Sequence, residues 1–69
     1  MSNPKNAPEV GTNPTKEEIK AARSSAGLSQ PAAAALIYKS VIAWKKWESG
    51  ERKMPADTWE LFNIKVKGE

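Results

Sequence analysis

The chain has 69 residues, which is enough for one small domain with a small core. It contains no cysteine and no histidine, so disulfides and thiolate metal sites are excluded, and the commonest acid-base group is absent. We therefore expect neither an enzyme nor a bound metal or other cofactor. The net charge of +3 and the isoelectric point near 9.4 favour an anionic partner without identifying it.

Hydropathy gives no sign of a membrane segment. The longest apolar run, 32–37, is far shorter than the roughly 18 residues that indicate a membrane span. The N-terminal residues also lack the apolar centre of a signal peptide. We expect a cytoplasmic protein with no membrane partner.

Residues 1–14 differ in composition from the rest of the chain. They carry three prolines and one glycine with hardly any apolar side chain, so they cannot bury enough surface to offset the entropy cost of ordering. The sequence predicts a disordered N-terminal arm over 1–14 and a folded domain over 15–69. Whether the arm orders against DNA or a partner chain is left open.

The first predicted helix covers 16–26. Thr15 and Glu18 have the spacing of a capping box, in which each side chain satisfies a backbone amide near the helix start. Gly27 is the residue type that most easily ends a helix. Apolar residues recur at helical spacing in between, at Ile19, Ala22 and Ala26.

A second helix is predicted over 30–37. Ser29 is a good N-terminal cap, and Pro31 falls in the first turn, where its missing N–H costs little. The alanine-rich sequence allows another helix to cross at close distance. Tyr38 and Lys39 are then expected to form a turn.

The third helix is predicted over 41–49, with Ser40 as its cap and Gly50 as its end. Trp44 and Trp47 are three residues apart, so both indoles lie on one helix face. We expect this aromatic face to pack in the core, and the intervening lysines to point elsewhere. The expected neighbours of the two indoles are Ile19, Leu28, Trp59 and Phe62.

A charged loop, 51–54, separates the third helix from a fourth over 56–64, which begins after Pro55. A fifth helix would be truncated to 65–69. The predicted fold class is all-α, a compact domain of four to five helices.

The pattern over 19–62 resembles the helix-turn-helix domain of the phage-repressor-like family, which includes the Cro, CI and Xre regulators. The matching features are an arginine in the first helix, Gly-Leu-Ser-Gln before the second, a capped third helix, and Glu-x-Gly at its end. The form W-x-x-W-E-x-G-x-R-x-M followed by W-x-L-F is similar to a subgroup of small prophage and plasmid regulators. The resemblance implies a lambda-repressor-like fold and no small-molecule ligand.

The resemblance also implies roles for individual residues, since in this family the third helix enters the major groove of double-stranded DNA. Gln30 would hold a phosphate at the start of the second helix. Lys45, Arg52 and Lys53 would contact other phosphates, and Arg23 and Glu48 would form a structural ion pair. The positions that face bases or line the groove would be Ser40, Val41, Ile42, Ala43 and Lys46.

Some positions depart from the family pattern and stay open. Val41 and Ile42 stand where many relatives carry glutamine, arginine or asparagine. Val41 either lines the groove or packs inward on Ala34. If Val41 packs inward, Ile42 is the groove residue. An apolar side chain there can recognise the thymine methyl group, and Lys46 can bond guanine. Lys39 replaces a usually buried residue and either stays clear of DNA or reaches a phosphate. The Tyr38 ring is expected on the core, with a phosphate contact as the alternative.

These features together predict a sequence-specific transcriptional regulator. We expect an autorepressor that binds an inverted repeat as a homodimer and blocks its own promoter. The truncated fifth helix leaves the fourth helix, the tails or the DNA itself to bring two copies together. Two alternatives remain: an antitoxin or co-regulator that acts mainly through a protein partner, and an interaction module that no longer binds DNA.

Overall fold

The computed structural model describes residues 13–68, so most of the predicted arm lies outside the described residues. The described part of the chain contains four helices and no strand: α1 (Lys16–Ser25), α2 (Gln30–Leu36), α3 (Val41–Ser49) and α4 (Ala56–Val66). The prediction of an all-α domain is confirmed. Of the predicted arm, the structure describes Asn13 and Pro14. Pro14 is buried, and the Asn13 side-chain amide donates to the Met54 carbonyl at 2.6 Å.

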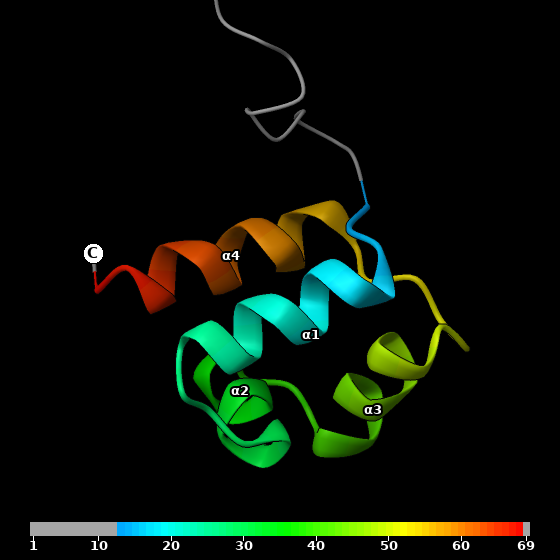
Figure 1. The fold of residues 1–69 in the computed structure, drawn as a ribbon, viewed down its shortest axis with the longest axis horizontal. Coiled ribbons are helices and arrows are strands. Elements are labelled where there is room, and N and C mark those ends of the chain that lie inside the picture. The colour runs from blue at the N-terminus through cyan, green and yellow to red at the C-terminus, as the bar shows by residue number, and fades with distance from the viewer. Residues whose placement is uncertain (1–12, 69) are drawn as a thin grey trace, which may run out of the picture.

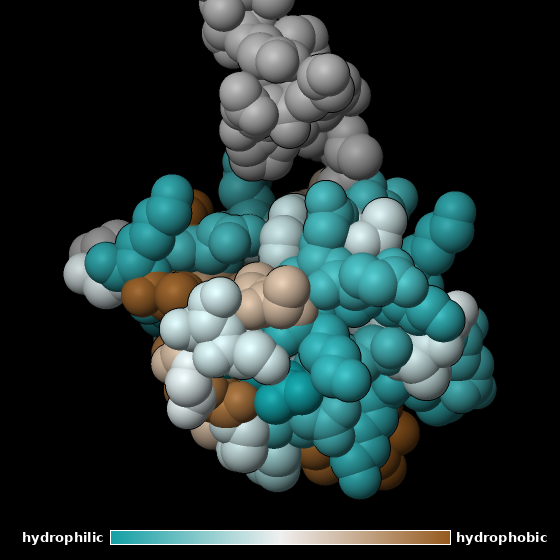
Figure 2. Space-filling view, in the orientation of Figure 1, coloured by the Kyte–Doolittle hydropathy of each residue, from teal (hydrophilic) through white to brown (hydrophobic). Residues whose placement is uncertain are grey.

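Figure 1 shows α1 across the middle of the molecule, with α4 on one side of it and α2 and α3 on the other. Helix α3 packs against both α1 and α2, and α4 packs against α2. The face drawn in Figure 2 is largely hydrophilic, with hydrophobic atoms beneath the C-terminal end of α4 and at the lower edge, in the region of α3. None of the described helices is long and apolar enough to cross a bilayer.

The helix ends follow the local signals in the sequence. Thr15 and Glu18 form the predicted capping box, with hydrogen bonds of 2.8 and 3.1 Å. Ser29 and Ser40 cap α2 and α3 in the same way, by accepting from the amides three residues later. Gly50 ends α3 with φ +85°, a left-handed conformation that glycine adopts at little cost.

The observed helix lengths differ slightly from the prediction. Helices α1 and α2 end one residue earlier than expected, at Ser25 and Leu36. Helix α4 extends two residues further, to Val66, and residues 67–68 form a turn. The described residues therefore contain no fifth helix.

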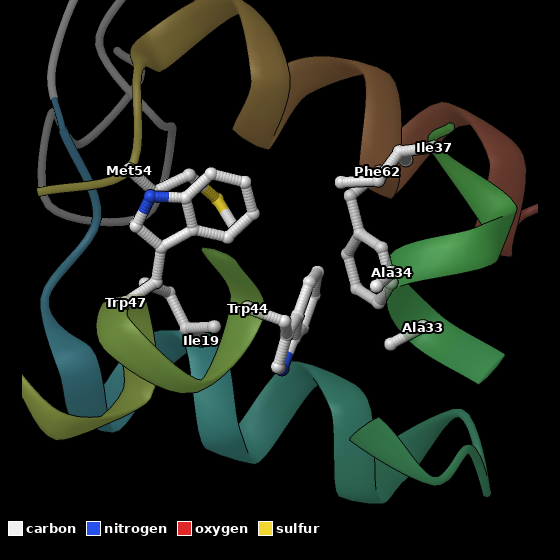
Figure 3. Close-up of a cluster of buried hydrophobic side chains, with 8 residues drawn as sticks. All are labelled: Ile19, Ala33, Ala34, Ile37, Trp44, Trp47, Met54 and Phe62. Atoms are coloured by element: carbon white, nitrogen blue, oxygen red, sulfur yellow. The ribbon is translucent and has the colours of Figure 1, made fainter. Parts of the chain in front are cut away.

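Both tryptophans of α3 lie in the core, as predicted (Figure 3). Trp44 is fully buried and Trp47 is 5% exposed, with their rings in an edge-to-face arrangement 5.8 Å apart. Trp44 also packs on Phe62 of α4 at 5.0 Å between ring centroids. The core cluster consists of Ile19, Ala33, Ala34, Ile37, Trp44, Trp47, Met54 and Phe62, with the predicted Leu28 and Trp59 half-buried against it.

The expectation that the Tyr38 ring lies on the core is wrong. Tyr38 is 77% exposed and has φ +61°, a left-handed conformation after α2 that accompanies an outward-pointing side chain. The preceding residue, Ile37, is buried in the core. The Tyr38 hydroxyl instead accepts a hydrogen bond from Lys65 Nζ at 3.1 Å, and the same ammonium lies 5.2 Å from the ring centroid.

Candidate nucleic-acid interface

Helix α3 has a buried aromatic face and an exposed face. Ile42 is 64% exposed, although it is a large apolar residue. Lys46 is half-buried and lies four residues further along, so the two side chains share the face turned away from Trp44. The Lys45 side chain, on the same helix, is exposed. This face is the part of α3 that solvent can reach.

The residues that open α3 are placed differently from one another. Lys39 and Ser40 are exposed, and the Ser40 hydroxyl accepts from the Ala43 amide at 3.1 Å, which leaves its own proton available. Val41 is half-buried. Ala43 packs against the core, so it contributes little more than its backbone to the exposed face.

Arg52 and Lys53 lie in the loop after α3, and both are exposed. The loop is tied back to the helix by a hydrogen bond from the Arg52 amide to the Lys46 carbonyl at 3.2 Å. Within residues 13–68, no ion pair is formed by any of the five cations predicted to contact DNA, which are Lys39, Lys45, Lys46, Arg52 and Lys53. Their charge is therefore not neutralised by a neighbouring carboxylate in this part of the chain.

Glu48, near the end of α3, accepts hydrogen bonds from three other side chains. Arg23 donates through Nε at 2.5 Å and Nη2 at 3.2 Å, which is the ion pair that the resemblance implies. The Trp44 indole donates to the same carboxylate at 2.6 Å, and the Gln30 amide donates at 3.0 Å. The carboxylate thus joins α1, α2 and α3 behind the exposed face.

These hydrogen bonds set the charge state of the pair. Burial raises the pKa of Glu48, but the hydrogen bonds from Arg23, Trp44 and Gln30 lower it by more, so the pKa lies below its usual value of 4.5. The hydrogen bond with Glu48 raises the pKa of Arg23, which burial opposes. Both groups are charged at neutral pH.

The sequence did not predict two of the Glu48 contacts. The Trp44 contact joins residues four apart on one helix and could have been found from that spacing. The Gln30 contact spans 18 residues and depends on how α2 crosses α3, which no local pattern reports. The predicted phosphate contact of Gln30 stays a prediction, now for a side chain whose amide already has one protein acceptor.

No group of acidic side chains among residues 13–68 is arranged to hold a metal ion. No protein-family model matches the chain, and no curated protein matches its sequence.

Proposed function

We propose that this protein is a sequence-specific DNA-binding transcriptional regulator of the helix-turn-helix type, and that it represses its own promoter by occupying it. In this proposal α2, the turn 37–40 and α3 form the helix-turn-helix unit, and α3 enters the major groove. The observation that carries the proposal is the exposed face of α3, where Ile42 projects into solvent and where Lys45 and Lys46 of the same helix form no ion pair within residues 13–68.

Specificity would come from two side chains on that face. Ile42 would contact the methyl group of thymine, because an exposed aliphatic side chain has no hydrogen-bonding group to offer a base edge. Lys46 would donate to guanine O6 or N7. Ser40 keeps a hydroxyl proton that can reach a base or a phosphate.

Affinity would come mainly from phosphates. Lys39 lies before the start of α3, and Arg52 and Lys53 lie beyond its end, so cations are present at both ends of the helix. When such cations bind phosphates, they release counterions from DNA, so the affinity depends strongly on salt. The logarithm of the binding constant should fall with the logarithm of the salt concentration, with a slope of about −0.9 per phosphate contacted.

A single domain of this size contacts too few base pairs to select one site in a genome. We therefore propose a homodimer on an inverted repeat, with the two α3 helices about 34 Å apart. The exposed side of α4 supports this, since Ile64 there is 46% exposed.

The test is a titration onto the upstream promoter duplex and onto a scrambled duplex of equal length, across a salt series. We expect tighter binding to the promoter at every salt concentration. Lys46→Ala should reduce the difference between the two duplexes by about 1 to 3 kcal/mol, whereas Arg52→Ala should weaken binding to both alike and flatten the salt slope by about 1. Identical behaviour of the two variants would contradict this division of roles.

A second candidate function is that of an antitoxin or co-regulator that acts through a protein partner. It is supported by exposed apolar side chains away from α3, namely Tyr38, Ile64 and Val66, which are 77%, 46% and 38% exposed. An Ile64→Lys variant separates the two: it should leave affinity for a single half-site unchanged if α3 carries the function. Because Ile64 also lies on the proposed dimer surface, only loss of regulation by a variant that still binds the full inverted repeat as a homodimer would favour the protein partner.

A further inference from the structure

A pocket of about 280 Å³ lies between the start of α1 and the end of α3. Residues 13–16 form one wall, and Gly50, Arg52 and Lys53 form the other. Ile19 and Trp47 contribute the apolar part of the lining, and both are buried core residues. The floor of the pocket is thus formed by residues of the hydrophobic core.

Trp47, which lines the pocket, carries a buried donor that has no acceptor in the described part of the chain. Its indole Nε1 is buried and makes no hydrogen bond within residues 13–68, whereas the Trp44 indole donates to Glu48 at 2.6 Å. Figure 3 shows the Trp47 nitrogen on the edge of the ring beside Met54, whose carbonyl is bonded to Asn13 of the pocket wall. A buried N–H without a partner is destabilising, so an acceptor oxygen that reaches it would be stabilised.

The charged lining of the pocket has one sign. Lys16, Arg52 and Lys53 line it, and among residues 13–68 no aspartate or glutamate does. None of these three cations forms an ion pair within residues 13–68. Together with the indole N–H, they present donors and positive charge to the same volume, which is a setting for an anion rather than for a neutral ligand.

We propose that this pocket binds an oxyanion of the phosphate or carboxylate class. One oxygen accepts the Trp47 indole proton, and Lys16, Arg52 and Lys53 neutralise the charge. The oxyanion has two sources, a free small anion or a phosphate of the DNA backbone, because Arg52 and Lys53 also take part in the proposed DNA contact. The site itself does not depend on DNA binding.

The indole N–H signals in a ¹⁵N–¹H correlation spectrum test the proposal directly, since the chain has three tryptophans. Inorganic phosphate and acetate are titrated separately against chloride at constant ionic strength. We expect the Trp47 indole proton to move downfield to a plateau as it gains an acceptor. The Trp44 signal, already bonded to Glu48, and the Trp59 signal should move little.

Two matched variants of α1 show whether the cations of the pocket matter. Lys16→Gln should weaken phosphate binding about fivefold, as expected for one exposed charge. Lys20→Gln removes an exposed lysine of the same helix that does not line the pocket, and it should leave the affinity unchanged. Equal effects of the two variants would overturn the proposal, because the anion would then respond to net charge alone.

Addition of duplex DNA separates the two sources. A backbone phosphate in the pocket moves the Trp47 signal on binding and competes with free phosphate, whereas a pocket for free anions keeps its phosphate affinity when DNA is bound. If the protein bound no DNA, the proposed function would fail while the phosphate titration still tested the pocket. The inference is overturned if neither the free anions nor the duplex moves the Trp47 signal.

Discussion

Glu48 accepts hydrogen bonds from Arg23, Gln30 and Trp44, which belong to three different helices. Its side chain is 7% exposed, and that of Arg23 is 17% exposed. A carboxylate in this position is stabilised by its donors, and loss of its charge would leave the Arg23 guanidinium without a counter-charge and weaken the hydrogen bonds from Trp44 and Gln30. The network therefore makes the position of α3 dependent on one residue.

Replacement of this carboxylate should destabilise the fold. We expect Glu48→Gln to lower the free energy of unfolding by about 3 kcal/mol, because Arg23 is left half-buried without a counter-charge. Urea denaturation followed by tryptophan fluorescence measures the change. Glu51→Gln is the control: Glu51 is exposed and should have almost no effect. Equal midpoints for the two variants would show that the pair contributes nothing.

The same network predicts a dependence on acid. The pKa of Glu48 is lower in the folded chain than its usual value of 4.5, so the folded state holds the carboxylate charged more firmly than the unfolded state does. The stabilisation that the charged Glu48 side chain gives the fold is fully present above about pH 4.5. It is lost as the pH falls through the lower pKa that Glu48 has in the folded chain. The difference in unfolding free energy between the native chain and Glu48→Gln should therefore shrink between pH 5 and pH 3. A difference independent of pH would contradict this assignment.

At the scale of elements, α2 and α3 begin with the same serine cap. Ser29 Oγ accepts from Ala32 at 3.2 Å, and Ser40 Oγ accepts from Ala43 at 3.1 Å. Ser29→Ala and Ser40→Ala should each cost about 1 kcal/mol of stability, as measured by urea denaturation. Only Ser40 belongs to the proposed DNA-facing surface, so only its variant should also weaken promoter binding beyond the effect of unfolding. If Ser29→Ala and Ser40→Ala lost equal amounts of promoter affinity, the Ser40 hydroxyl would lie outside the DNA-binding surface.

The helix boundaries could be predicted because their causes are local. The caps at Thr15, Ser29 and Ser40 lie within three residues of the amides they satisfy, and Gly50 acts through its own backbone. Met54 was placed in a charged loop, yet it is fully buried among the core residues. The packing of a loop residue depends on distant elements, and the sequence pattern around it carries no such information.

At the scale of the whole molecule, the part of the candidate site that depends on helix periodicity alone could be predicted. The spacing of Trp44 and Trp47 indicated which face of α3 is buried, and the opposite face then followed. The pocket beside Trp47 was not predicted, because residues 13–16 and 50–53 meet only after α1 has packed on α3. Contacts between segments so far apart arise from the tertiary fold.

The exposed side of α4 has a self-complementary order of charges. Glu60 and Ile64 are exposed on α4, and Lys67 is exposed at the residue that caps its C-terminal end, so their spacing of four and three residues places them in one stripe. A symmetric dimer uses the same surface on both copies. If two α4 helices pair in antiparallel fashion about an axis near Ile64, Glu60 of each copy faces Lys67 of the other.

Charge reversal tests whether this stripe is the contact of the proposed homodimer. Each dimer would contain two Glu60–Lys67 pairs, and at about 0.7 kcal/mol per exposed pair Glu60→Lys alone should weaken dimerisation about tenfold. Lys67→Glu alone should do the same, whereas the double variant restores both pairs with reversed polarity and should regain the native dissociation constant. Sedimentation equilibrium at low salt, without DNA, measures this independently of any change in DNA affinity. A double variant as weak as either single variant would exclude the antiparallel contact, because restoration requires that the two positions face each other across the two-fold axis.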